Sequence, residues 1–90
     1  SFSELEQARL EKERAEAAIA NAEARYGGMF GNMRRKRDLK KLESGKYKGT
    51  DKGYYVASAV AGQSAIDHDK PKDVSTINRY YDDAIVDYVE

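Results

Sequence analysis

The chain of 90 residues has no cysteine, no tryptophan, a single proline and no long hydrophobic run. Without cysteine it has no disulfide framework and no thiolate that could bind a metal or attack a substrate, which favours an intracellular, cytoplasmic protein. A membrane-spanning helix needs about 20 mostly apolar residues. No stretch approaches that length, and the acidic start does not resemble a positively charged leader peptide, so we expect no membrane partner.

Large apolar side chains are also scarce. Leu, Ile, Val and Phe make up 15 of the 90 residues, below the roughly 20% that marks a disordered chain when the net charge is also high. Here the formal net charge is zero, so we expect a folded domain with a thin core. Such a small domain gains stability by self-association or from a partner. We therefore predict one domain that forms a homo-oligomer or binds a protein partner.

Zero net charge conceals a segregation of charge along the chain. Residues 1–33 have a net charge of −2, residues 34–52 of +6 and residues 53–90 of −4. Such blocks can bind an external polyanion, or the basic block can fold onto the acidic ends of its own chain. The single domain 1–90 divides into an acidic amphipathic helix over 1–26, a glycine-hinged basic segment over 27–52 and a C-terminal helical part over 53–90.

The first segment has the periodicity of an amphipathic helix from about Ser3 to Tyr26. Ser3 followed by Glu6 is typical of a capping box, in which the two side chains satisfy unpaired amides at a helix start. Spacings of three and four residues then place one seam on a single face, formed by Leu5, Ala8, Lys12, Ala15, Ile19, Ala22 and Tyr26. The alanines permit a second helix to approach closely. We favour an antiparallel hairpin within the chain over an intermolecular coiled coil.

Glycines surround a short apolar plug after this helix. Gly27 and Gly28 are expected to end the helix in the left-handed C-cap conformation, and Asn32 to cap the next helix. Between them, Met29 and Phe30 can tuck under the hairpin as core, which we favour, or project into a partner. The second option keeps both residues as interface candidates.

A second helix is expected from Met33 to Ser44. Leu39 and Leu42 are its only large apolar residues after Met33, so its buried stripe is narrow and its outer surface strongly cationic. Several cations on one helix face can displace the counterions of nucleic-acid phosphates. The candidate polyanion-binding residues are Arg34, Arg35, Lys36, Arg37, Lys40 and Lys41. A solvated face, or one that matches an acidic protein surface, is the alternative interpretation.

A third helix is expected over residues 53–66, with Thr50 or Asp51 as its cap. Its small residues could pack on the alanines of the first helix, although a strand through Tyr55 and Val56 stays open. A polar turn follows, and a final helix starts at Asp73 or Ser75. The seam of this last helix consists of Val74, Ile77, Tyr81, Ala84 and Tyr88, widened by Ile85. The fold class expected is all-α, a small three- or four-helix domain built on a helical hairpin, in an oligomer.

Seven tyrosines are many for so small a chain. Tyrosine is enriched at protein interfaces because it combines a large contact area with a polar tip. We expect Tyr26, Tyr81 and Tyr88, which fit the seams, to pack in the core. The interface candidates are Met29, Phe30, Tyr47, Tyr54, Tyr55 and Tyr80.

No pattern points to catalysis, a metal or a cofactor. The polar turn gathers possible metal ligands, namely Asp67, His68, Asp69 and Asp73, without the spacing of a calcium loop or a zinc site. His68 is the only histidine and has no candidate nucleophile near it in sequence. Asp82 and Asp83 point roughly 100° apart on a helix and so do not form an acid–base pair. We expect a protein without enzymatic activity and without a cofactor.

These observations favour a small assembly or adaptor protein, or a component of a larger particle. Its helical seams and tyrosines would dock to protein partners, and its basic helix would meet an acidic surface. One alternative is a nucleic-acid-binding protein that uses the basic helix over residues 33–44. A further alternative is a phage or plasmid protein that inhibits a host factor through the same surface.

Overall fold

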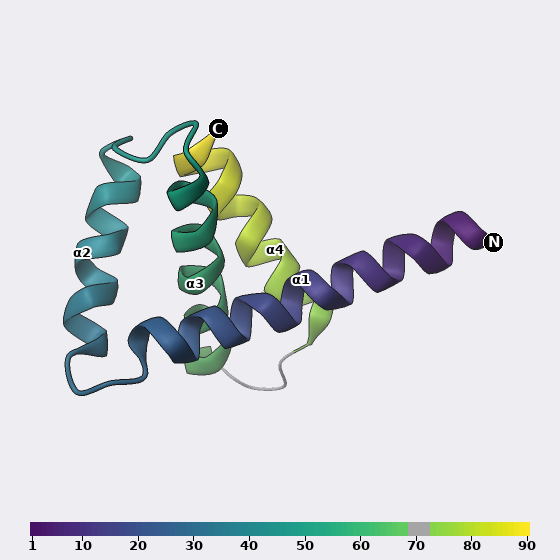
Figure 1. Ribbon diagram of the computed structural model, residues 1–90, viewed down its shortest axis with the longest axis horizontal. Helices are drawn as coiled ribbons and strands as arrows, with labels where there is room; N and C mark the ends of the chain where they lie inside the picture. The colour runs from purple at the N-terminus through teal and green to yellow at the C-terminus, as the bar shows by residue number, and fades with distance from the viewer. Residues whose placement is uncertain (69–72) are drawn as a thin grey trace.

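The computed structural model describes residues 1–68 and 73–90, which form helices and the turns between them (Figure 1). The helices are α1 (Phe2–Tyr26), α2 (Gly31–Glu43), α3 (Asp51–His68) and α4 (Val74–Ala84), followed directly by a π-helix, η1 (Ile85–Val89). No strand forms within the described residues, so the all-α prediction is confirmed and the alternative strand near Tyr55 does not occur. Part of the expected polar turn, residues 69–72, lies outside the described residues.

Helix α1 begins earlier than its sequence pattern predicted. Ser1 is the N-cap, and its hydroxyl accepts a hydrogen bond from the amide of Glu4 at 3.3 Å while the Glu4 side chain bonds back to Ser1. The predicted capping box of Ser3 and Glu6 is therefore wrong. Ser1 and Glu4 are also three residues apart. They form the capping box because the unpaired backbone amides lie at the actual start of the helix.

Small residues bring α1 and α3 very close together. Ala15, Ala18 and Ala22 of α1 are all buried. A Cβ atom placed on Gly62 of α3 would lie 2.0 Å from the carbonyl oxygen of Ala18, so only glycine permits this approach. The prediction that the third helix packs its small residues on the first helix is confirmed. α3 and α4 form the antiparallel hairpin of the fold, and α1 crosses it (Figure 1).

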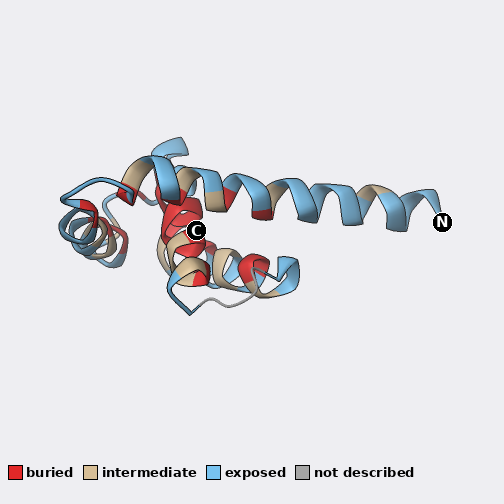
Figure 2. Ribbon diagram, turned by 90° about the horizontal axis from the view of Figure 1, so that it is seen from below, coloured by how far each residue is buried: buried red, intermediate tan, exposed pale blue. Residues whose placement is uncertain are grey.

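The first half of α1 projects beyond the other helices. Figure 2 shows this part of the ribbon almost entirely exposed, whereas buried residues begin near the middle of the helix. The predicted seam is accordingly buried only from Ala15 onward, and Leu5, Ala8 and Lys12 are exposed. Leu5 exposes 72% of its surface. The sequence pattern continues along α1 past the point where α3 and α4 cross it, so among the described residues no other helix packs on the first part of the seam.

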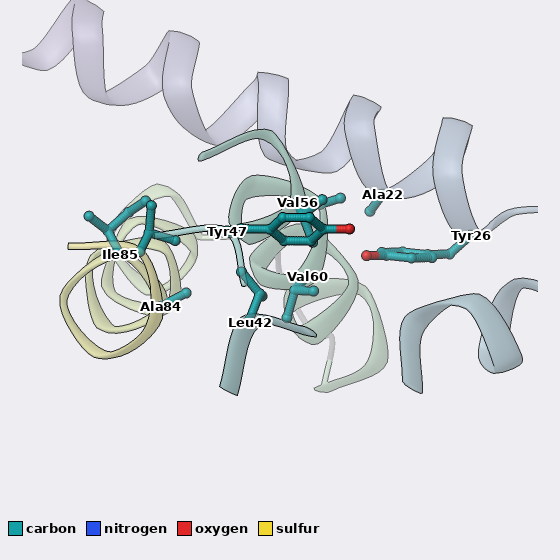
Figure 3. Packing of buried hydrophobic residues seen from close by; sticks show 11 residues of the cluster. Ala22, Tyr26, Leu42, Tyr47, Val56, Val60, Ala84 and Ile85 are labelled. Atoms are coloured by element: carbon teal, nitrogen blue, oxygen red, sulfur yellow. The ribbon is translucent and has the colours of Figure 1, made fainter. Parts of the chain in front are cut away.

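The main core lies where α2, α3 and the end of the chain meet. Figure 3 shows the ring of Tyr47 entering this cluster from the loop between α2 and α3. Tyr47 exposes only 7% of its surface, so the prediction that it is an interface residue is wrong. The loop folds back over the core because the amide of Gly49 donates a hydrogen bond to the carbonyl of Val89 at 3.0 Å.

The end of the chain departs from the seam that the sequence predicted. Ala84 and Ile85 are buried as expected. From Ile85 onward the backbone forms a π-helix, whose wider turn rotates the later side chains relative to an α-helix. As a result Val89 is fully buried, while Tyr88 is only half-buried, like Tyr81.

The connection between α1 and α2 is tighter than expected. Gly27 is right-handed, with φ −77°, and Gly28 is not left-handed either, so the predicted left-handed C-cap is wrong. α2 already begins at Gly31, and Asn32 lies inside the helix instead of capping it. A Cβ atom on Gly31 would lie 1.8 Å from the carbonyl oxygen of Tyr26. Glycine is therefore required where the two helix ends meet.

This tight connection turns the apolar plug outward. Met29 exposes 90% of its surface and Phe30 67%. The prediction that both tuck into the core is wrong, because the short turn between the two helix ends holds both side chains on its outer side. Both residues lie on the surface, at the start of the cationic helix.

Candidate functional site

The inner face of α2 is anchored by an acid that lies within the cationic run. Asp38 exposes 2% of its surface and accepts hydrogen bonds from Arg25 Nε at 2.6 Å, from a second Arg25 nitrogen at 3.0 Å, and from the Tyr26 hydroxyl at 2.6 Å. Burial alone would raise the pKa of Asp38, but the hydrogen bonds from Arg25 and Tyr26 outweigh it and hold that pKa below its ordinary value. Asp38, which interrupts the basic run in the sequence, is therefore buried and does not lie on the outer surface of α2.

The outer face of α2 carries the predicted polyanion-binding residues. Arg34, Lys36, Arg37 and Lys40 are exposed, and Arg35 and Lys41 are half-buried. Across residues 1–68 and 73–90, none of these six side chains has a carboxylate within ion-pair distance. α2 packs on α1, α3 and η1 and does not meet α4, so the acidic fourth helix does not cover it. The charges of Arg34, Lys36, Arg37 and Lys40 therefore face solvent, whereas Arg35 Nε is buried.

An exposed apolar cluster adjoins these cations at the start of α2. Phe30, Met33, Arg34 and Arg37 line an open hollow of about 350 Å³. Met33 exposes 51% of its surface, and its sulfur accepts a hydrogen bond from Arg37 at 3.5 Å. We name this surface the α2 docking face, made of Met29, Phe30, Met33, Arg34 and Arg37. The sequence pointed to most of these residues, but only the fold brings the plug and the cations onto one surface.

The remaining tyrosines predicted at an interface are not part of that surface. Tyr54 and Tyr55 each expose 38% of their surface, and Tyr80, in the middle of α4, is half-buried. The guanidinium of Arg25 lies over the ring of Tyr55 at 5.6 Å, and the Tyr54 hydroxyl donates a hydrogen bond to Glu90 at 3.3 Å. Their rings already have partners within the domain, and their role at an interface stays a prediction.

A polar cluster between α1 and α4 was not found from the sequence. Buried Asn78 donates hydrogen bonds to the carbonyls of Glu11 at 2.9 Å and Val74 at 3.0 Å, and accepts one from Arg14 Nε at 2.5 Å. Arg14 also pairs with Asp82 at 3.1 Å. These residues lie more than 60 positions apart in the chain, and no local pattern indicates such a pair. The cluster fixes α4 to α1 where the projecting half of α1 begins.

A larger hollow, of about 570 Å³, lies between α1 and α4. It is lined by Ala15, Glu16, Ile19, Ala20, Glu23, Val74 and Ile77. Among the described residues that line it, the only polar side chains are two glutamates of α1, and none of these residues indicates a ligand.

The acidic turn shows no metal centre in the part that can be described. Among residues 1–68 and 73–90, no three potential ligands are grouped as a metal site requires. His68 Nδ1 lies 2.9 Å from the carbonyl oxygen of Ser64, within its own helix. Asp69, which belonged to the same sequence cluster, falls outside the described residues.

No helix in the described part of the chain combines the length and apolar character needed to cross a bilayer. No family model, curated protein or solved structure matches the chain. The candidate site therefore depends on its geometry and chemistry alone.

Proposed function

We propose that the protein is a non-enzymatic docking protein that binds an acidic protein surface through the α2 docking face. The observation that carries this proposal is the exposure of Phe30 and Met33 beside two arginines that have no carboxylate partner within the described residues, with exposed Met29 next to Phe30 in the chain. The hydrophobic effect disfavours exposing such side chains to water. A partner that covers them offsets that cost.

The composition of the face agrees with a protein partner. Protein interfaces are enriched in aromatic residues, methionine and arginine, and are depleted of lysine. Phe30, Met33, Arg34 and Arg37 supply these residue types around one hollow. The flexible thioether of methionine also adapts to the shape of a partner. An acidic amphipathic helix has the matching chemistry, since its apolar side chains can enter the hollow while its carboxylates meet the arginines.

The second half of the α1 seam, which the sequence assigned to docking, is part of the core. Ala15, Ala18 and Ala22 are buried in the core clusters of the domain. The docking face proposed here is therefore the exposed start of α2 and not this buried half of the seam or the tyrosines. Exposed cations around the hollow would speed encounter with an acidic partner and make the association sensitive to salt.

A direct test uses a short synthetic helical peptide with glutamates on one face and leucines on the other. Its binding to the full chain is measured by fluorescence anisotropy. We expect the double variant Met29→Ser/Phe30→Ser to weaken binding at least about tenfold, or about 1.4 kcal/mol. Val86→Ser, which removes an equally exposed apolar side chain (68%) on η1, is the matched control.

Two results would count against docking at this face. One is peptide binding that survives the loss of both apolar side chains. The other is an equal loss of binding in the Val86→Ser control. Circular dichroism of each variant confirms that the helices are retained.

A second candidate function is contact with nucleic-acid phosphates. The specific observation in its favour is that Arg34, Lys36, Arg37 and Lys40 of α2 are exposed and that α4 does not cover this helix. A mixed-sequence oligonucleotide should then bind with an affinity that falls steeply as salt rises. Binding should be lost when Arg34, Arg35, Arg37 and Lys41 are changed to glutamine. Met29→Ser/Phe30→Ser should leave oligonucleotide binding unchanged, which separates this function from protein docking.

A further inference from the structure

The projecting half of α1 is a second unpartnered surface. We name residues 2–13 the acidic arm. All of them are exposed except the half-buried Glu6. Twelve helical residues extend about 18 Å, and most of this length lies beyond every other element in both views (Figures 1 and 2).

Local interactions keep the acidic arm helical. Arg9 pairs with Glu6 and with Glu13, the latter at 2.6 Å, and Gln7 donates a hydrogen bond to Glu11 at 3.4 Å. Each such pair adds a small stabilisation to an exposed helix. The buried half of α1 nucleates the helix, so the arm is a preformed rod that loses little conformational entropy when it docks.

The chemistry of the acidic arm complements the α2 docking face. Four glutamates against one arginine and one lysine give the arm a net charge of −2. Between them stand three exposed apolar side chains, Phe2 (82%), Leu5 (72%) and Leu10 (47%). Acidic and apolar groups together are the partner chemistry proposed above for the α2 docking face. The 13 residues of α2 extend about 20 Å, so the two helices match in length.

The acidic arm cannot reach the docking face of its own chain. α2 packs beside the last turns of α1, and the arm extends in the opposite direction (Figures 1 and 2). α1 is one continuous helix, so the arm cannot fold back. The complementary surfaces can therefore meet only between two molecules.

We propose that the acidic arm of one copy docks on the α2 docking face of a second copy. This inference rests on the proposed function, because it names the partner of the same face. The contact joins two different surfaces and is thus heterologous, so each copy keeps one free arm and one free face. Repetition of the contact builds a closed ring or an open filament, whereas a symmetric dimer would use one surface twice.

A complementation experiment tests this arrangement with the full chain. Glu4→Lys/Glu11→Lys reverses charge on the arm and leaves the docking face intact. Arg34→Glu/Arg37→Glu reverses charge on the docking face and leaves the arm intact. Each variant alone should be monomeric in light scattering after size exclusion. Mixed together, they should associate in equal amounts, because the unchanged arm of one variant meets the unchanged face of the other and the two reversed surfaces also carry opposite charges. Asp83→Lys/Asp87→Lys, which alters two exposed acids outside the arm and the docking face, should associate as the wild type does.

Salt and the acidic peptide complete the test. Raising salt from about 0.05 M to about 0.5 M should weaken self-association about tenfold or more. A wild-type chain that stays monomeric, or variants that associate separately but form no mixed complex, would overturn the inference. If the chain is monomeric while the peptide binds in a Phe30-dependent way, self-docking is wrong and the proposed function stands. If the peptide does not bind either, both are wrong.

Discussion

Replacement of Asp38 by asparagine tests how the cationic helix is attached to the domain. The carboxylate accepts three hydrogen bonds, two from Arg25 and one from Tyr26. Its side chain is 3% exposed and that of Arg25 is 18% exposed. Asparagine has nearly the same shape but no charge, and its amide nitrogen cannot accept a hydrogen bond. The change therefore leaves a mostly buried guanidinium without its counter-charge.

The expected loss of stability is large for so small a domain. Breaking a buried ion pair by removing one partner costs about 3–5 kcal/mol. Arg25 keeps some access to water and the asparagine oxygen can still accept one bond, so we expect about 3 kcal/mol, at the low end. A 90-residue domain has about 5–13 kcal/mol in total. At about 4–8 °C per kcal/mol, Tm should fall by about 12–24 °C.

Urea unfolding at pH 7, followed by circular dichroism, measures this loss as a difference in the free energy of unfolding. Asp87→Asn, which changes an exposed aspartate of η1, is the control and should stay within about 0.5 kcal/mol of the wild type. If Asp38→Asn also stays within that range, the ion pair does not stabilise the domain and the reasoning fails.

The pH dependence gives the same prediction a second check. The pKa of Asp38 is held below its ordinary value in the folded protein, and the unfolded chain takes up its proton near pH 4. The stabilisation is therefore complete above about pH 5 and is lost as pH falls through the folded pKa. The stability difference between wild type and Asp38→Asn should shrink below about pH 4. A difference that stays constant down to pH 2 would contradict this linkage.

Two other predictions follow from close contacts. Burial, and then the hydrogen bond to Asp38, raise the pKa of Tyr26 above its ordinary value, so stability should fall as pH rises above about 10, where the unfolded tyrosine ionises. Tyr26→Phe should lessen this fall in urea unfolding measured between about pH 8 and pH 11, and an unchanged slope would argue against it. Gly62→Ala should cost about 1–3 kcal/mol despite the better helix propensity of alanine, because the new methyl group meets the backbone of Ala18. Gly28→Ala, whose methyl group meets nothing within 4 Å, is its control, and a Gly62→Ala variant more stable than the wild type would refute the close approach.

Much of the fold was predictable from local sequence. The periodicity of apolar residues indicated the helices in their correct order, and the start of α2 was misplaced by only two residues. The small residues of α3 indicated its close packing on α1. Such features depend on residues a few positions apart, which the helix geometry itself brings onto one face.

The candidate site was predicted only in part. The cationic residues of α2 were evident, but Asp38 among them gave no sign that it is buried, because its partners come from α1. Met29 and Phe30 were expected in the core because they are apolar, and the contact between Gly31 and the end of α1 turns them outward. Tyr47 was expected on the surface, and the hydrogen bond between Gly49 and Val89 closes its loop over the core.

The sequence by itself determined the helical class, the element order and the segregation of charge, since each follows from composition or from short-range periodicity. The tertiary structure decided which side chains meet solvent. Burial depends on surfaces that distant segments supply, and the same apolar pattern is core in the second half of α1 and exposed in the first. The acidic arm is exposed because α3 and α4 run across the second half of α1 instead of along its whole length, and the α2 docking face is exposed because α4 does not reach α2.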